Sequence, residues 1–211
     1  FLRENASSLK NQTTRMDNNL LFSILSEPIE LDFETKDLTL TNRLKPLQEF
    51  KDSGNVLEGA KYDFISYQEL NQRIYYVQHS EEGVPIADGT ATLVFHLNAD
   101  NEVISYEQTY VGDSESQGRL RTVISEQTAI ESLYLNNQIP DDSTIRLLTL
   151  SYYQTLSLKD MNIYSPMWYV EIVRENVGIQ VKRVDALTGS IISAPVVQED
   201  NADAMESESF S

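Results

Sequence analysis

Cysteine is absent from this sequence of 211 residues, which excludes disulfides, thiolate catalysis, iron–sulfur clusters and cysteine-ligated zinc. Glycine is scarce, with eight residues, and neither G-x-x-x-x-G-K-[ST] nor G-x-G-x-x-G occurs to bind a phosphate. Long hydrophobic runs are missing as well. The longest, near Leu20–Leu25, is far shorter than the roughly 20 residues that cross a bilayer. The sequence therefore indicates neither a nucleotide-dependent enzyme nor a membrane span within these residues.

Positively charged residues are also few. The chain has 16 Lys and Arg against 33 Asp and Glu, which gives a net charge of −17. Nucleic-acid affinity is built mainly from Lys and Arg that replace phosphate counterions, so binding to DNA or RNA is excluded. The same charge repels an anionic membrane, so membrane association requires an apolar anchor. Hydrophobic residues still make up 40% of the chain, enough for a core in one domain or two small ones.

Histidine occurs only twice, as His79 and His96, on two different predicted strands. Alternation along residues 91–97 places Leu93, Phe95 and Leu97 on one face, so His96 is expected on the other, at the rim of the core. No H-x-x-x-H, H-E-x-x-H or G-x-S-x-G motif accompanies either histidine. We therefore predict no catalytic, cofactor-binding or metal-ligating residue, and no cofactor.

Acidic residues gather in a block from 81 to 118 that contains no Lys or Arg. Its members are Glu81, Glu82, Asp88, Asp100, Glu102, Glu107, Asp113 and Glu115. Such a block is compatible with a Ca²⁺ site or with a pair of catalytic carboxylates. The spacing of an EF-hand is absent, however, and a solvated acidic face is the simpler interpretation.

A helix followed by strand-like runs is predicted in the first half of the chain. Asn42 is expected to cap a short helix that contains Leu44, Leu47 and Phe50. Strand-like alternation follows at Tyr62–Tyr67, Arg73–His79, Thr90–Leu97 and Glu102–Tyr110. The last two runs are joined by a turn in which Asn98 can form an Asx-turn and Asn101 requires a positive φ. This turn predicts a β-hairpin.

The second half repeats the order of the first. Ser125 is expected to cap a helix whose Ala129, Ile130, Leu133 and Tyr134 share one face. Strand-like runs follow at Thr144–Tyr153, Met167–Arg174, Gly178–Asp185 and Ser190–Ser193. Asp185 and Gly189 predict a second tight turn. The single Trp168 alternates with Val170 and Ile172, so we expect all three in a core.

These patterns predict an α+β fold of two similar subdomains, each a helix packed on an antiparallel β-meander. We expect the N-terminal subdomain over 42–115 and the C-terminal subdomain over 116–197. Residues 1–41 are predicted to be a polar lead-in, and the first 20 of them to be either an irregular lead-in or a frayed helix. Residues 198–211 carry five acids and no Lys or Arg, which predicts an acidic disordered tail.

Several segments of the chain resemble the YycI (WalI) family. In the first half they are Gly83-Val84-Pro85-Ile86-Ala87-Asp88, Leu93-Val94-Phe95-His96-Leu97-Asn98 and Ile104-Ser105-Tyr106-Glu107-Gln108-Thr109-Tyr110. In the second half they are the stretches 124–134, 164–170 and 184–189. The resemblance extends roughly from Tyr62 to Ile192. Its most specific element is Tyr106-Glu107-Gln108-Thr109 together with the helix that follows.

The resemblance implies a regulator without enzymatic activity. Members of the YycI family come from Gram-positive bacteria and are held by one N-terminal transmembrane helix, with the soluble part outside the cell. By this resemblance, the chain is the extracytoplasmic part of such a protein, and its membrane anchor lies upstream of Phe1. It is expected to bind the membrane sensor histidine kinase YycG (WalK) together with a YycH-like protein, and so to modulate the two-component system that controls cell-wall metabolism.

Two other functions stay open on the residues alone. One is a cell-wall glycan hydrolase that uses two carboxylates of the acidic block. The other is a Ca²⁺-dependent surface binding module that uses Asp100, Glu102 or the acids of the tail. The sequence predicts no interface residues, no oligomeric state and no direction of kinase regulation.

Overall fold

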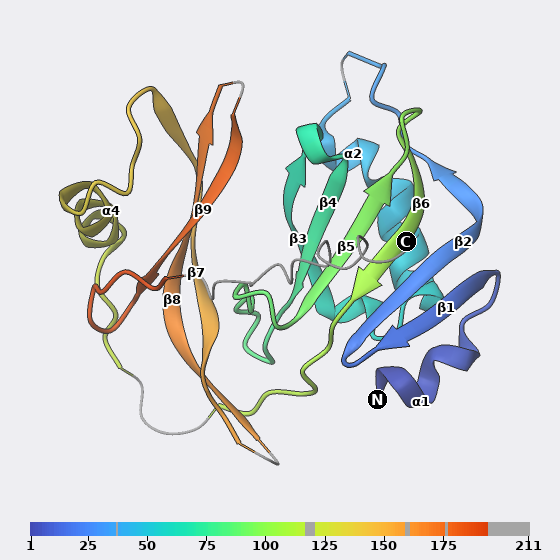
Figure 1. Cartoon of the computed structure of the whole chain (residues 1–211), viewed down its shortest axis with the longest axis horizontal. Coiled ribbons are helices and arrows are strands. Elements are labelled where there is room, and N and C mark those ends of the chain that lie inside the picture. The colour runs from blue at the N-terminus through green and yellow to red at the C-terminus, as the bar shows by residue number, and fades with distance from the viewer. Residues whose placement is uncertain (37, 117–120, 159–160, 176, 194–211) are drawn as a thin grey trace, which may run out of the picture.

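The computed structural model describes residues 1–36, 38–116, 121–158, 161–175 and 177–193. These residues form two antiparallel sheets, one of six strands and one of three, with a few helices around them (Figure 1). The predicted α+β class and the arrangement in two subdomains are confirmed. The predicted acidic tail, 198–211, lies outside the described residues. The boundary at 115/116 stays a prediction, and it falls in the connection between the two sheets.

The six-stranded sheet is built mainly from the predicted meander. Its strands are β1 (Gln12–Asp17), β2 (Leu20–Glu30), β3 (Tyr62–Gln68), β4 (Arg73–Gln78), β5 (Thr92–Leu97) and β6 (Glu102–Gln108). Their order across the sheet is β1-β2-β6-β5-β4-β3. The four strands predicted in the first half thus lie side by side in sequence order. The turn between β5 and β6 is the predicted one, since Asn98 Oδ1 accepts the N–H of Asp100 at 2.9 Å and Asn101 has a φ of 61°.

The polar lead-in contains a hairpin that the sequence pattern did not predict. Among residues 1–36, helical turns are confined to α1 (Leu2–Asn5) and η1 (Ala6–Ser8), and β1 and β2 follow. Asp17 pairs with Leu20 across a two-residue turn in which Asn18 has a φ of 50°. Leu21 and Leu25 of β2 point into the core, so this hairpin extends the sheet beyond β6 and buries apolar surface there. The expected frayed helix is therefore wrong from residue 12 onward.

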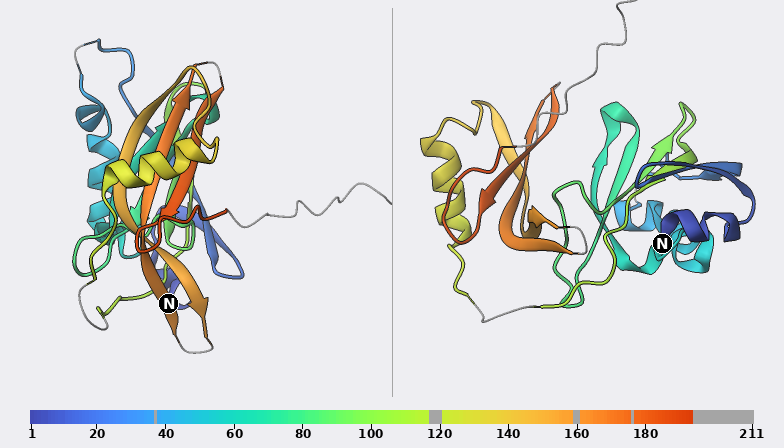
Figure 2. Two further views of the ribbon diagram at one scale, coloured as in Figure 1. Left: turned by 90° about the vertical axis from the view of Figure 1, so that its left-hand side faces the viewer. Right: turned by 60° about the horizontal axis from the view of Figure 1, so that its bottom comes forward.

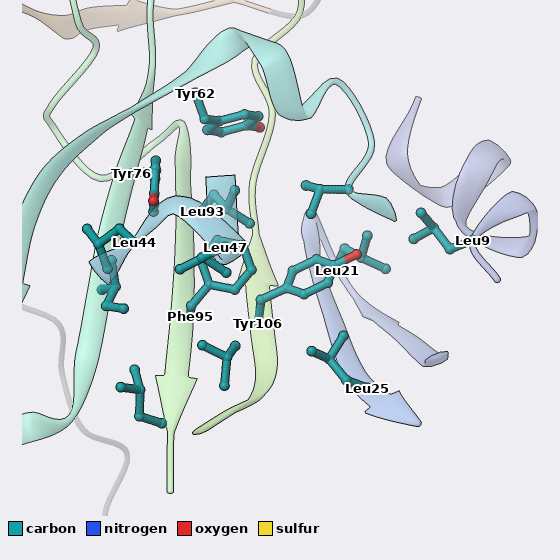
Figure 3. Close-up of a cluster of buried hydrophobic side chains, with 14 of the residues drawn as sticks. Leu9, Leu21, Leu25, Leu44, Leu47, Tyr62, Tyr76, Leu93, Phe95 and Tyr106 are labelled. Carbon is teal, nitrogen blue, oxygen red and sulfur yellow. The ribbon is translucent and has the colours of Figure 1, made fainter. Parts of the chain in front are cut away.

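Short helices cover the core face of this sheet (Figure 3). They are α2 (Leu40–Arg43), α3 (Lys45–Phe50), η2 (Lys51–Asn55) and η3 (Gly59–Lys61), whereas η4 (Glu69–Asn71) lies in the connection between β3 and β4. Leu44 and Leu47 pack with Phe95 of β5 in one apolar cluster, as predicted. The predicted cap is displaced, however. Thr39 is the N-cap, because its hydroxyl oxygen accepts the N–H of Asn42 at 3.3 Å.

The second unit is a three-stranded sheet with one helix against its outer side (Figures 1 and 2). Its elements are α4 (Glu126–Leu135), β7 (Ser143–Ser157), β8 (Asn162–Arg174) and β9 (Gly178–Asp185). Ala129 and Leu133 of α4 pack with Trp168 in a second core, as predicted. The predicted fourth run, Ser190–Ser193, is not a strand. Within the described residues it contributes an isolated bridge between Ile191 and Val184 after the turn that Asp185 caps.

Candidate partner-binding surfaces

The connection between β4 and β5 forms a joint between the two units. The carbonyl of Pro85 accepts the hydroxyl of Ser151 at 2.7 Å and the N–H of Tyr152 at 2.8 Å. The N–H of Ala87 donates to Ser151 Oγ at 3.0 Å, and Asp88 Oδ2 accepts the N–H of Gln154 at 2.6 Å. Residues 85–88 thus pair with the outer edge of β7. The first segment that resembles the YycI family therefore has a structural role in joining the sheets.

An ion pair between a partly exposed arginine and a buried carboxylate strengthens the joint at a second point. Glu171 of β8 is fully buried, and Arg146 of β7 donates to its Oε2 through Nε at 2.9 Å. Arg146 lies in a β-bulge, which directs its side chain across to the first unit. There it donates to Ser66 Oγ at 2.6 Å and to the carbonyl of Tyr67 at 3.2 Å. The Arg146 guanidinium therefore donates hydrogen bonds to two oxygen atoms of β3 and neutralises the Glu171 carboxylate of β8.

Apolar side chains fill the space between the sheets. Val77 and Ala87 from the first unit pack with Met167 and Tyr169 from the second. Burial, followed by the neighbouring Glu171 carboxylate, raises the pKa of the Tyr169 hydroxyl. This third cluster packs the sheets directly against each other, and the two hollows described next lie away from it.

The outer face of α4 exposes apolar side chains. Tyr134 and Leu135 are 70% and 77% exposed. Together with Ile130, Glu131 and Ile139 they line a shallow hollow of about 350 Å³. The expectation that Tyr134 shares the buried face of α4 is wrong, because a residue five positions after Ala129 lies about 140° around the helix from it. This face, called the α4 surface below, is our first candidate for a partner contact.

A second hollow lies between the short helices and the edge of the first sheet. It has a volume of about 320 Å³ and is lined by Leu40, Thr41, Asn42, Leu44, Lys45, Gln48, Phe64 and Tyr76. Phe64 is partly exposed on the edge strand β3 and packs edge-on against Tyr76, with ring centroids 5.8 Å apart. The lining is more polar than the α4 surface, so we rank it second.

The two histidines do not form a common site. His96 faces away from the core as predicted, with Nε2 at 3.3 Å from Glu107 Oε1. Burial of the ring lowers the pKa of His96, and the Glu107 carboxylate offsets this only in part. His79 lies in a bridge with Pro85, and its Nδ1 contacts the carbonyl of Ser80 at 3.0 Å. Neither ring contacts the other, because β4 ends before His79 whereas His96 lies opposite Arg73, at the far end of β4.

The acidic block is dispersed, and several of its carboxylates serve the fold. Asp88 caps Thr90 and binds β7, Glu102 accepts the side-chain amide of Asn98 at 2.6 Å, and Asp113 pairs with Lys61. Across the described ranges, no three or more His, Asp or Glu side chains come together as a metal site. In the same ranges, no helix has the length and apolar character needed to cross a membrane.

Comparison with known proteins identifies a family. The family model described as YycI protein matches residues 1–187. No curated protein shows significant similarity. Among solved structures, the Bacillus megaterium YpeB C-terminal domain matches with a TM-score of 0.45 and 14% identity, over 85% of this chain and 79% of that one. An uncharacterized protein from Eubacterium rectale matches with a TM-score of 0.49 and 11% identity, over 91% and 80%.

Proposed function

Because the chain belongs to the YycI family, we propose that it binds the membrane sensor histidine kinase YycG (WalK) together with a YycH-like protein, and thereby adjusts control of cell-wall metabolism. A role in regulating the YycFG two-component system follows from the family itself, which is a family of membrane-associated regulators. We further propose that one transmembrane helix preceding Phe1 anchors the protein, with these residues outside the cell. The match over residues 1–187 carries the proposal.

The α4 surface supports a binding mechanism. Exposed large apolar side chains that line a hollow are typical of protein contacts, and Tyr134 and Leu135 are of this kind. A regulator without chemistry of its own acts by binding one conformation of the kinase more tightly than another. A shared membrane raises the effective concentration of the two proteins, so a weak contact between soluble parts is sufficient.

Co-purification from membranes tests this proposal. The full-length protein with its natural upstream segment is compared with Tyr134→Ser/Leu135→Ser, and each is probed for the kinase and the YycH-like protein. We expect capture of at least one of the two to fall about ten-fold in the variant, equivalent to about 1.4 kcal/mol.

The matched control is Leu70→Ser, which removes an equally exposed leucine from η4. Absence of the kinase and of the YycH-like protein from the wild-type sample would contradict the regulator proposal. Equal capture by wild type and variant would contradict only the role of the α4 surface.

A further inference from the structure

The β7–β8 hairpin extends well beyond the rest of the second sheet (Figure 1). β9 pairs only with Met167–Arg174 of β8, and the joint with residues 85–88 extends along β7 as far as Gln154. Residues 155–158 and 161–163 therefore project as a two-stranded arm. Gln154 Nε2 and Ser157 Oγ both donate to Asn162 Oδ1, at 3.3 and 2.8 Å. These bonds tie the two strands together as far as Ser157 and Asn162.

Among the described residues near the end of the arm, four apolar side chains share one face. Leu156 pairs with Ile163, and the N–H of Leu158 donates to the carbonyl of Met161 at 2.8 Å, so these two cross-strand pairs lie on the same face. The four side chains are 47%, 42%, 49% and 52% exposed, in the order Leu156, Ile163, Leu158, Met161. Ser157 and Asn162 lie on the opposite face. We call these four residues the hairpin tip.

The charge of the arm differs from that of the chain. The chain carries a net charge of −17, yet residues 147–170 contain one Lys and one Asp and no other charged residue. An acidic surface is repelled by an anionic bilayer, whereas a neutral apolar projection is not. The arm is therefore suited to approach a membrane, unlike most of the molecule.

The position of the hairpin tip favours a membrane over a protein groove. Figures 1 and 2 place the end of the β7–β8 hairpin and the N-terminus on the same side of the molecule. A helix that precedes Phe1 and enters a bilayer holds this side towards the lipid. The four side chains of the tip are also all apolar, and none of them is one of the aromatic or Arg side chains that dominate protein hot spots.

We propose that the hairpin tip inserts into the membrane interface and fixes the orientation of the extracytoplasmic part relative to the bilayer. This inference rests on the proposed N-terminal anchor. Four half-exposed side chains bury less apolar surface than one acyl chain, which alone gives marginal binding. The contact therefore forms when the chain is tethered, and the untethered chain stays in solution.

Single-cysteine labelling tests the proposal directly, because the natural sequence contains no cysteine. The chain is tethered through an N-terminal His-tag to phosphatidylcholine vesicles that contain nickel-chelating lipid, and an NBD label is placed at Leu158→Cys. We expect the emission to rise about two-fold and shift to shorter wavelength on tethering, because the label moves from water to an apolar environment. Lipids brominated in the acyl chains are then expected to quench it. The matched control is a label at Leu70→Cys, whose site is 71% exposed in the β3–β4 connection, and its emission is expected to stay unchanged.

Three outcomes would overturn the proposal. The first is an unchanged label at position 158 on tethered vesicles. The second is a change that depends on protein concentration without vesicles, which would indicate a second copy of the chain. The third is a change only when the kinase's extracytoplasmic part or the YycH-like protein is added. Since the vesicle assay contains neither protein, its result is independent of kinase capture, and the two proposals fail separately.

Discussion

Arg146 and Glu171 form the most consequential polar contact between the two units. Replacing Arg146 with Met leaves a fully buried carboxylate without its cation. Removing one partner of a buried pair typically costs about 3–5 kcal/mol, and the partial exposure of Arg146 places the loss near the lower end. We therefore expect Arg146→Met to lower the free energy of unfolding by about 3 kcal/mol in urea denaturation.

A double variant separates the effect of the unpaired Glu171 charge from the effect of losing the Arg146 side chain. In Arg146→Met/Glu171→Gln the buried group is neutral and can still accept a hydrogen bond from Tyr169, so part of the lost stability is expected to return. Arg174→Met, which replaces an exposed arginine at the end of β8, is the control and should change little. If Arg146→Met lowers the free energy of unfolding no more than the control does, the ion pair does not stabilise the fold.

Asp185 makes stability depend on pH through the turn after β9. Burial favours its protonated form, but hydrogen bonds from the Tyr153 hydroxyl and from the N–H groups of Thr188 and Leu187 outweigh burial and lower the pKa of Asp185 below its ordinary value of 3.8. The unfolded state therefore binds this proton at higher pH than the folded state. The stabilisation by the carboxylate is present above about pH 4 and is lost as the pH falls through the folded pKa.

Asp185→Asn is the corresponding test. We expect it to lower the free energy of unfolding by about 1–2 kcal/mol at pH 7, where the wild-type group is charged. The difference between wild type and variant should shrink in denaturation series below pH 4, because the wild-type carboxyl becomes neutral too. Asp141→Asn, at an exposed position, serves as control. A difference that persists unchanged at pH 2.5 would mean that the charge of Asp185 is irrelevant.

At the scale of elements, α4 depends on its N-cap. Ser125 Oγ accepts the N–H of Thr128 at 3.1 Å. Losing such a cap costs about 1 kcal/mol, so Ser125→Ala should lower the thermal midpoint by roughly 2–4 °C in a chain of this size. Ser125→Asp keeps an acceptor and adds a favourable charge at the helix N-terminus, and should melt near the wild type. Equal midpoints for the Ala and Asp variants would argue against the cap.

Ser125 also illustrates which elements the sequence predicts well. The cap, the apolar spacing of α4 and the alternation of β3 to β6 are local signals, and they place these elements within a few residues. β1 was missed because it is a polar edge strand whose outward side chains carry no hydrophobic pattern. The two asparagines at 18 and 19, between residues that alternate in burial, are the signal that identifies this hairpin.

β8 shows why the surfaces between elements were harder to predict. Alternation correctly assigned Trp168, Val170 and Ile172 to the core under α4. It gave no reason to expect that Met167 and Glu171, on the other face, are buried too. Their burial depends on the first unit packing against that face, which is a contact distant in sequence. The candidate surfaces on α4 and the hairpin tip likewise follow from which residues stay uncovered, and only the three-dimensional arrangement determines this.

At the scale of the whole molecule, the joint should make the two units unfold together. The third core cluster, the ion pair and the strand-like pairing of residues 85–88 all connect the sheets, so opening one sheet exposes apolar surface of the other. The single Trp168 reports on the second unit, whereas far-UV circular dichroism reports on both sheets. We expect the two signals to give one coincident transition in denaturant.

Met167→Ala is the variant that probes this coupling. Met167 is fully buried between the sheets, and such truncations cost about 2–5 kcal/mol. If the units are coupled, the fluorescence and dichroism midpoints move together by the same amount. If the sheets unfold independently, the Trp168 transition moves alone and the two curves separate. A rigid joint matters for the proposed mechanism, because only then does lipid contact at the hairpin tip set the direction in which the α4 surface faces a partner.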